Sequence, residues 1–157
     1  MDERVRPRNP EKVAASIAPD YSLGAHVAAL GLDFSSAVMG PEFADGAFVG
    51  MHGSWNRSDP VGYKVVFVPF RNGRPAGDPI DFVTGFRDDD GTTRGRPVGV
   101  TVDPRGALIV ADDLSNTIWR VSRIGAAAAP AAMPAPEPAA DEGADGAEAG
   151  PLEAPPR

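Results

Sequence analysis

The chain has 157 residues with 42% hydrophobic and 24% charged content, which is typical of one globular domain with its own core. Its formal net charge of −7 argues against nucleic-acid binding, because neutralising phosphates requires a basic face. The absence of cysteine excludes disulfides, thiolate metal sites and a cysteine nucleophile, and no stretch reaches the ~20 apolar residues of a membrane-spanning helix.

Residues 1–28 predict an irregular N-terminal segment. Its charged start lacks the apolar core of a signal peptide, and residues 10–15 allow one helical turn at most. Two interpretations of this start stay open, a cytoplasmic protein or a chain that begins downstream of its true start. The segment therefore leaves the localisation unknown.

Residues 29–124 predict two antiparallel sheets in which the same order of strands occurs twice. Each unit begins with a glycine-led strand, continues with a Gly-Ala-apolar strand and then has an alternating, β-branched strand. Asn72-Gly73 and the run Asp103-Pro104-Arg105-Gly106 are tight-turn signals between strands. The predicted strands are 31–34, 46–50, 64–68 and 80–85 in the first unit, and 99–102, 106–110 and 117–121 in the second.

Short antiparallel strands in units of four are typical of β-propeller blades. The predicted fold class is therefore all-β: a β-propeller fragment of about two four-stranded antiparallel blades, of which the last lacks its outer strand. A propeller needs at least about four blades to close, and open sheet edges invite aggregation. We therefore expect missing blades or other copies of the chain to complete the ring. Phe67 and Trp119 fit strand positions that face the core.

Residues 125–157 predict a disordered acidic tail rich in alanine and proline. The tail has almost no branched or aromatic residues, so its packing cannot offset the entropy lost on ordering it. It also holds six of the acidic residues against one arginine. The net charge therefore says little about a partner of the folded part.

The loop after the second predicted strand, 52–58, concentrates side chains that can bind a ligand. It reads His-Gly-Ser-Trp-Asn-Arg-Ser, and loops at one mouth of a propeller are where ligands bind. His52 and Trp55 are therefore candidate pocket-lining residues. The alternatives are a long hairpin loop capped by tryptophan packing, and a buried structural role for the histidine.

Arg94 and Arg96 lie two residues apart just before the first strand of the second unit. In an extended chain such residues point to the same side, so the two guanidinium groups can face one carboxylate or phosphate. The alternative is a solvated loop with two surface arginines. Asp113, at the end of the next predicted strand, either lines the same pocket or bonds to a neighbouring loop.

Three ordered motifs carry a resemblance to a known family. HGSWNRSDPVGYKVVFVPF, GRPVGVTVDPRGALIVADD and NTIWRVS resemble the C-terminal part of the glucose/sorbosone dehydrogenase family, and within it the sorbosone dehydrogenase-like proteins. The resemblance runs from about residue 8 to 121. It implies a six-bladed propeller enzyme that oxidises an aldose or sorbosone by hydride transfer to pyrroloquinoline quinone. The implied partners are the sugar and an electron acceptor such as a cytochrome.

The resemblance also assigns roles to residues of this chain. It implies that Arg94 and Arg96 hold the carboxylates of the quinone, with Arg57 and its neighbour Asn56 as further contacts from the preceding blade. The family's catalytic histidine comes from an early blade, where His52 does not lie, so we predict no catalytic residue here. The family's calcium ligands are also upstream, so no metal site is predicted. Alone, the chain is expected to be inactive.

A second function class stays open beside the enzyme. Two blades per chain could close into a ring by homo-oligomerisation, which would make the chain a non-catalytic binding or assembly module. Members of the family are commonly periplasmic, so a periplasmic location is implied by resemblance alone.

Overall fold

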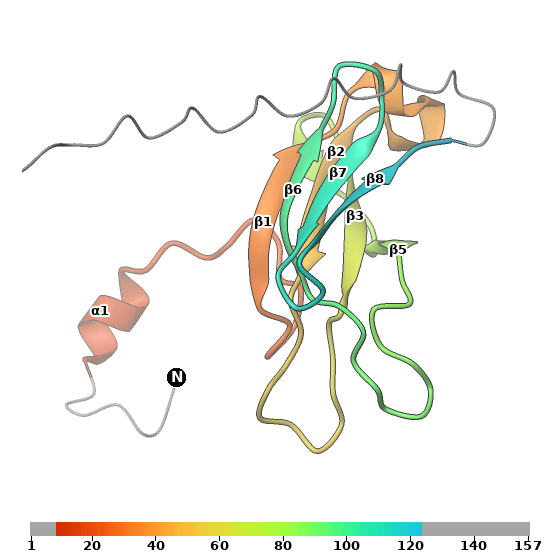
Figure 1. Cartoon of the computed structure of the whole chain (residues 1–157). Coiled ribbons are helices and arrows are strands. Elements are labelled where there is room, and N and C mark those ends of the chain that lie inside the picture. The colour runs from red at the N-terminus through yellow and green to blue at the C-terminus, as the bar shows by residue number, and fades with distance from the viewer. Residues whose placement is uncertain (1–8, 124–157) are drawn as a thin grey trace, which may run out of the picture. The chain divides into compact units, whose positions relative to one another are not determined.

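The computed structural model describes residues 9–123, and antiparallel strands are its main regular elements (Figure 1). One short helix, α1 (Pro10–Ala14), precedes the strands, and its proline occupies the first turn, where a missing N–H costs nothing. Two 3₁₀ turns, η1 (Ala37–Met39) and η2 (Pro41–Phe43), follow the first strand. The all-β prediction and the single helical turn are confirmed, and the predicted tail lies outside the described residues.

The first sheet contains five strands. They are β1 (Ala29–Phe34), β2 (Gly46–Met51), β3 (Lys64–Arg71), β4 (Arg74–Pro75) and β5 (Ile80–Val83). All pairings are antiparallel, and β3 pairs with β2 on one side and with β4 and β5 on the other. Asn72 and Gly73 both have positive φ, which suits the tight hairpin turn between β3 and β4. The predicted fourth strand is therefore present as β5.

The second sheet has three strands in the order β6 (Pro97–Val102), β7 (Leu108–Asp112) and β8 (Thr117–Val121). Within residues 9–123 no fourth strand pairs with β8, as the sequence predicted. Phe67 is buried in the core, but the core prediction for Trp119 is wrong, because this side chain is 45% exposed. The reason is its position on β8, an edge strand with nothing paired beyond it in the described chain.

The two sheets pack face to face around one hydrophobic cluster, to which Phe48 and Phe67 contribute from the first sheet and Leu108 and Val110 from the second. Glycine permits this approach: a Cβ on Gly31 would lie 2.3 Å from the carbonyl oxygen of β6 residue 98. The contact brings the end of β2 close to the start of β6, where the candidate site lies.

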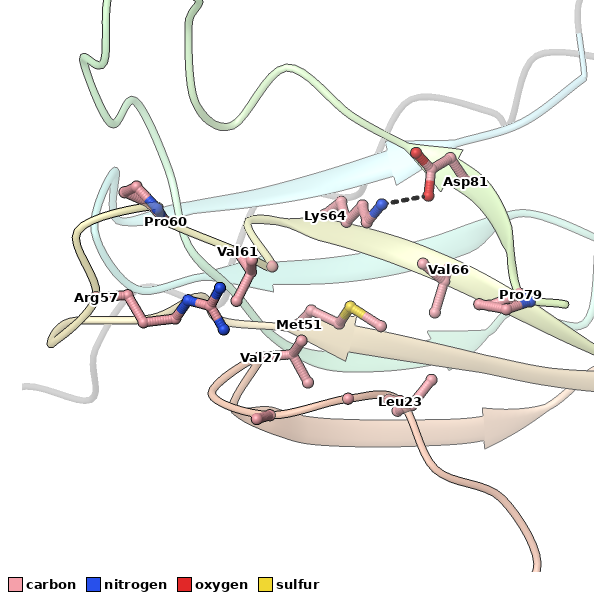
Figure 2. Close-up of a pocket in the computed structure, with 13 residues that line it drawn as sticks. Leu23, Val27, Met51, Arg57, Pro60, Val61, Lys64, Val66, Pro79 and Asp81 are labelled. Atoms are coloured by element: carbon pink, nitrogen blue, oxygen red, sulfur yellow. Dashed lines mark ion pairs between the residues drawn. The ribbon is translucent and has the colours of Figure 1, made fainter.

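The other face of the first sheet carries a second apolar cluster. Val66 and Met51 line a pocket of about 530 Å³ there, partly covered by Leu23 and Val27 of the N-terminal segment (Figure 2). On β1, alternate residues face outward and stay exposed, with Phe34 at 62%. A contiguous exposed apolar face of this kind is typical of a packing surface.

Candidate functional site

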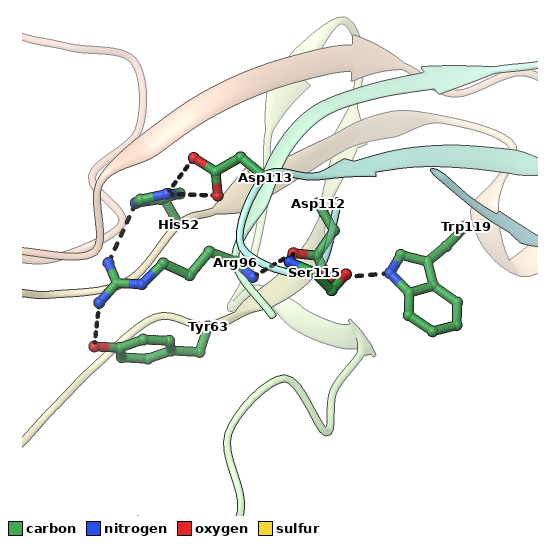
Figure 3. A network of polar contacts seen from close by, with 7 residues as sticks. All are labelled: His52, Tyr63, Arg96, Asp112, Asp113, Ser115 and Trp119. Carbon is green, nitrogen blue, oxygen red and sulfur yellow. Dashed lines mark hydrogen bonds and ion pairs between the residues drawn. The ribbon is translucent and has the colours of Figure 1, made fainter. Parts of the chain in front are cut away.

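A network of polar side chains joins the end of β2 to the start of β6 (Figure 3). The Arg96 guanidinium lies at its centre, with Nη1 3.4 Å from His52 Nδ1 and Nη2 3.4 Å from the hydroxyl of Tyr63. His52 Nε2 lies 3.1 Å from both carboxylate oxygens of Asp113. These residues are distant in sequence, and the packing of the two sheets brings them together.

The contacts of His52 fix its tautomer. An arginine side chain can only donate, so His52 Nδ1 accepts from Arg96, and Nε2 carries the proton that is donated to Asp113. Both ring nitrogens are therefore engaged, and neither has a free lone pair for a substrate proton. His52 links Asp113 to the Arg96 guanidinium in this arrangement.

The ring and the hydroxyl of Tyr63 both contact the Arg96 guanidinium. Its φ of 56° lies in the left-handed region, which is rare for a bulky residue and often marks a functional site. The Arg96 guanidinium carbon lies 5.1 Å from the ring centroid, within range of a cation–π interaction. The Tyr63 hydroxyl donates to the carbonyl of Ser54, and Gly53 leaves the ring room, since a Cβ there would be 2.7 Å from it.

A second cation lies over the same ring. The guanidinium carbon of Arg87, from the loop after β5, is 5.9 Å from the Tyr63 centroid. Within residues 9–123, neither Arg87 nor Arg96 forms an ion pair with a carboxylate. The site therefore gathers two guanidinium groups over one ring, of which Arg87 also interacts electrostatically with Asp90 in its own loop. Paired guanidinium groups suit a bound anion.

Sequence reasoning missed both Tyr63 and Arg87. Only the Gly62-Tyr63 step before β3 hinted at an unusual backbone, and the arginine looked like any loop cation.

Three of the predicted site residues meet in this network, namely Arg96, His52 and Asp113. Arg94 does not join them, because its exposed side chain pairs with Asp88 in its own loop. The two arginines precede β6, which begins only at residue 97, and they belong to no strand. Residues 94 and 95 both donate backbone N–H bonds to the carbonyl of Phe86.

The remaining candidates lie along the loop between β2 and β3. Trp55 is 87% exposed and Asn56 is also exposed. Arg57 donates from Nε to the carbonyl of Asp59 and lines the pocket on the opposite face of the first sheet (Figure 2). The structure thus places Arg57 beside Met51 and Val66, apart from the cluster around Tyr63.

Asp112 is the buried carboxylate of the network, with 3% of its surface exposed. Burial acts to raise its pKa, but hydrogen bonds from the backbone of Arg96, from Ser115 and from the indole of Trp119 lower the pKa below the ordinary aspartate value. Asp112 is therefore an anion that hydrogen bonds from neutral groups stabilise. It closes the network on the side away from His52 (Figure 3).

Across residues 9–123, no three histidine or acidic side chains gather as metal ligands would. The same stretch contains no helix long and apolar enough to cross a bilayer.

Residues 8–124 match the model of the TrAA12-like family. The chain belongs to this family. A protein of Borreliella burgdorferi described as uncharacterised is 40% identical over 103 residues, which are 64% of this chain and 27% of that protein.

Two solved structures are similar to the chain. The PQQ domain of pyranose dehydrogenase from Coprinopsis cinerea, in its holo form, is 29% identical with a TM-score of 0.51, over 62% of this chain and 27% of that one. A carbohydrate-active enzyme of family AA12 from Trichoderma reesei is 30% identical with a TM-score of 0.50, over 62% and 25%. The chain thus spans about a quarter of the length of these relatives.

The comparisons confirm the resemblance to the quinone-dependent sugar dehydrogenases. The chain corresponds to part of a quinoprotein oxidoreductase-like protein.

Proposed function

We propose that this chain supplies one wall of the cofactor site in a pyrroloquinoline quinone-dependent oxidoreductase that oxidises a glucose- or sorbosone-type sugar. The observation that carries the proposal is the pair Arg87 and Arg96, two cations on the ring of Tyr63 that form no ion pair with a carboxylate among residues 9–123. Membership of the TrAA12-like family and the likeness to a PQQ domain support the choice of anion.

The residues present fit the cofactor's chemistry. Pyrroloquinoline quinone is a flat anion with three carboxylates, and guanidinium groups bind carboxylates through two parallel hydrogen bonds. Arg96 and Arg87 would hold these carboxylates, and the Tyr63 ring, which both guanidinium groups contact, would keep the two cations close together. When bound, the quinone supplies the hydride acceptor, and the protein supplies orientation and charge.

The other predicted contacts complete the proposal. Arg94 joins the site if its side chain leaves Asp88 and binds a carboxylate of the cofactor. Breaking this ion pair costs little free energy, because the pair is exposed. Arg57 and Asn56 contact the cofactor only if their loop turns toward Tyr63. His52, Trp55 and Asp113 line the pocket, with His52 held by Asp113 as described above. We assign no catalytic residue to this chain and place the base in another part of the protein.

The proposed partners are a small sugar and an electron acceptor such as a cytochrome, in a periplasmic location. Further blades, or other copies of this chain, would cover the exposed β1 face and complete the ring. Calcium would bind outside the described residues.

The test is made on the protein encoded by the complete gene. Quenching of its tryptophan fluorescence by pyrroloquinoline quinone gives the affinity, and dye reduction with a panel of aldoses and sorbosone gives the activity. We expect Arg96→Ala and Arg87→Ala to weaken quinone binding, with Arg105→Ala, an arginine in the turn after β6, as the control. If none of the sugars gives quinone-dependent dye reduction, the proposed enzymatic function is wrong.

The exposed apolar face of β1 favours a second candidate, a non-catalytic module that closes by association of copies. Native mass spectrometry separates the two: a closed oligomer of this chain without quinone-dependent activity supports the module, and a monomeric, active gene product excludes it.

A further inference from the structure

Asp112 lies at the end of β7 and is buried, although it carries a charge. Burying a carboxylate costs free energy unless hydrogen bonds replace its water. Among residues 9–123, Asp112 and Ser54 are the only polar side chains buried to this degree. A carboxylate that stays buried despite this cost in free energy is expected to have a structural or functional role.

The hydrogen bonds of Asp112 show what it holds. One oxygen accepts from the backbone N–H of Arg96 at 2.8 Å and from that of Ser115 at 3.1 Å. The other oxygen accepts from the indole Nε1 of Trp119 at 3.1 Å. All three donors are neutral, and no cation of the described chain forms an ion pair with this carboxylate. Its charge is thus engaged with the backbone of the arginine that faces the proposed cofactor (Figure 3).

Gly95 shows how closely the segment before β6 is packed on this carboxylate. A Cβ at residue 95 would lie 2.1 Å from the second oxygen of Asp112 and 2.7 Å from the ring of Phe86. The carbonyl of Phe86 accepts the backbone N–H groups of residues 94 and 95 at 2.8 and 3.1 Å. Residues 94–96 are therefore held by hydrogen bonds to Asp112 on one side and to Phe86 on the other.

We propose that Asp112 is a positioning residue that presents Arg96 to the anionic cofactor, an inference that rests on the proposed function. By holding the Arg96 backbone, the carboxylate sends the side chain toward His52 and Tyr63, so the guanidinium is in place before the ligand arrives. Such preorganisation strengthens binding because the side chain loses little conformational entropy when the ligand binds.

The substitution Asp112→Asn tests this with little change in volume. If the amide oxygen stays on Arg96 and Ser115, its NH₂ group faces the indole N–H of Trp119, and two donors then oppose each other. If the amide turns over, the donor clash moves to Arg96. We expect the affinity for pyrroloquinoline quinone to fall about tenfold, as for a buried donor left unpaired.

A double substitution and a matched control sharpen the test. Asp112→Asn with Trp119→Phe removes the opposing donor, and we expect it to recover most of the affinity. Asp103→Asn changes another aspartate of the same sheet, whose carboxylate accepts from the backbone of residues 105 and 107 at the far end of β6. We expect this control to lower the melting temperature and leave the affinity unchanged.

The readouts separate this inference from the proposed function. Affinity comes from fluorescence titration of the complete gene product, and the reactivity of Arg96 without cofactor comes from phenylglyoxal modification and peptide mass mapping. An unchanged affinity and an unchanged Arg96 modification rate in folded Asp112→Asn would overturn the positioning role. Equal loss of affinity in the Asp103→Asn control would also overturn it. If the wild type does not bind the quinone, the proposed function fails, and a faster modification of Arg96 in Asp112→Asn still supports the positioning role.

Discussion

The hydroxyl of Tyr63 and the guanidinium of Arg96 lie 3.4 Å apart, although 33 positions separate the two residues in sequence. The same hydroxyl donates to the carbonyl of Ser54, so the ring is anchored to the loop after β2 while it carries the arginine of the next sheet. One side chain therefore couples the two loops that bear most of the predicted site residues.

The coupling predicts distinct effects for two substitutions of Tyr63. Tyr63→Phe keeps the ring under Arg96 and loses the hydroxyl, so we expect a loss of about 1 kcal/mol in unfolding free energy. Tyr63→Leu also removes the cation–π contact, and we expect the larger loss of quinone affinity from this variant. Urea denaturation and fluorescence titration measure the two quantities. Equal affinities for both variants would show that the ring does not support Arg96.

The glycine contact between the sheets predicts a stability difference between two similar substitutions. A Cβ on Gly31 would lie 2.3 Å from a backbone oxygen of β6, whereas a Cβ on Gly99 of that strand would meet nothing closer than 3.8 Å. We expect Gly31→Ala to cost about 1–3 kcal/mol, as overpacking does. Gly99→Ala is the matched control and should change stability little. Denaturant unfolding measures both, and an equal response would mean that the sheets do not meet at Gly31.

The lowered pKa of Asp112 predicts a loss of stability in acid. A carboxyl whose pKa is lower in the folded than in the unfolded state contributes its full stability above the unfolded value of about 3.9, and the contribution is lost as pH falls through the folded value. Comparing unfolding free energies at pH 6 and below pH 4, we expect a smaller decrease in Asp112→Asn than in the wild type. An identical pH dependence in the two proteins would contradict the assignment of a charged Asp112.

The exposed face of β1 predicts self-association of the 157-residue chain. Leu30, Leu32 and Phe34 lie on one side of that strand and are all exposed. We expect sedimentation velocity to show concentration-dependent species that Leu32→Glu reduces. Ile17→Glu is the control, because Ile17 is also exposed but lies outside the sheet. If both variants associate like the wild type, another surface is responsible.

The strands and turns could be predicted from the sequence because alternation and glycine-led starts are local signals. The two sheets, the Asn72-Gly73 hairpin and the fourth strand of the first sheet all follow from them. The core position of Trp119 was a wrong prediction, because alternation shows which side of a strand a residue takes and cannot show that the strand is an edge.

The site was only partly predictable for a physical reason. The rule that places Arg94 and Arg96 on one side holds for a regular strand, whereas both residues lie before β6 and Arg94 pairs with Asp88 in its own loop. Tyr63 and Arg87 enter through long-range packing and a left-handed backbone, for which the Gly62-Tyr63 step is the one hint in the sequence. Arg96, His52 and Asp113 were predicted because their residue types suit ligand binding, and the packing of the two sheets brings them into one network.

The close approach of the two sheets at Gly31 and Gly50 has a consequence for how this protein can vary. His52 follows a strand of one sheet and Arg96 precedes a strand of the other, so the distance between them depends on the spacing of the sheets. A slip of one residue would move the strands by about 3.3 Å, more than a hydrogen bond can follow. Substitutions at these two glycines would therefore change the distance between His52 and Arg96 without touching a ligand. The glycines set this distance because they set the spacing of the sheets.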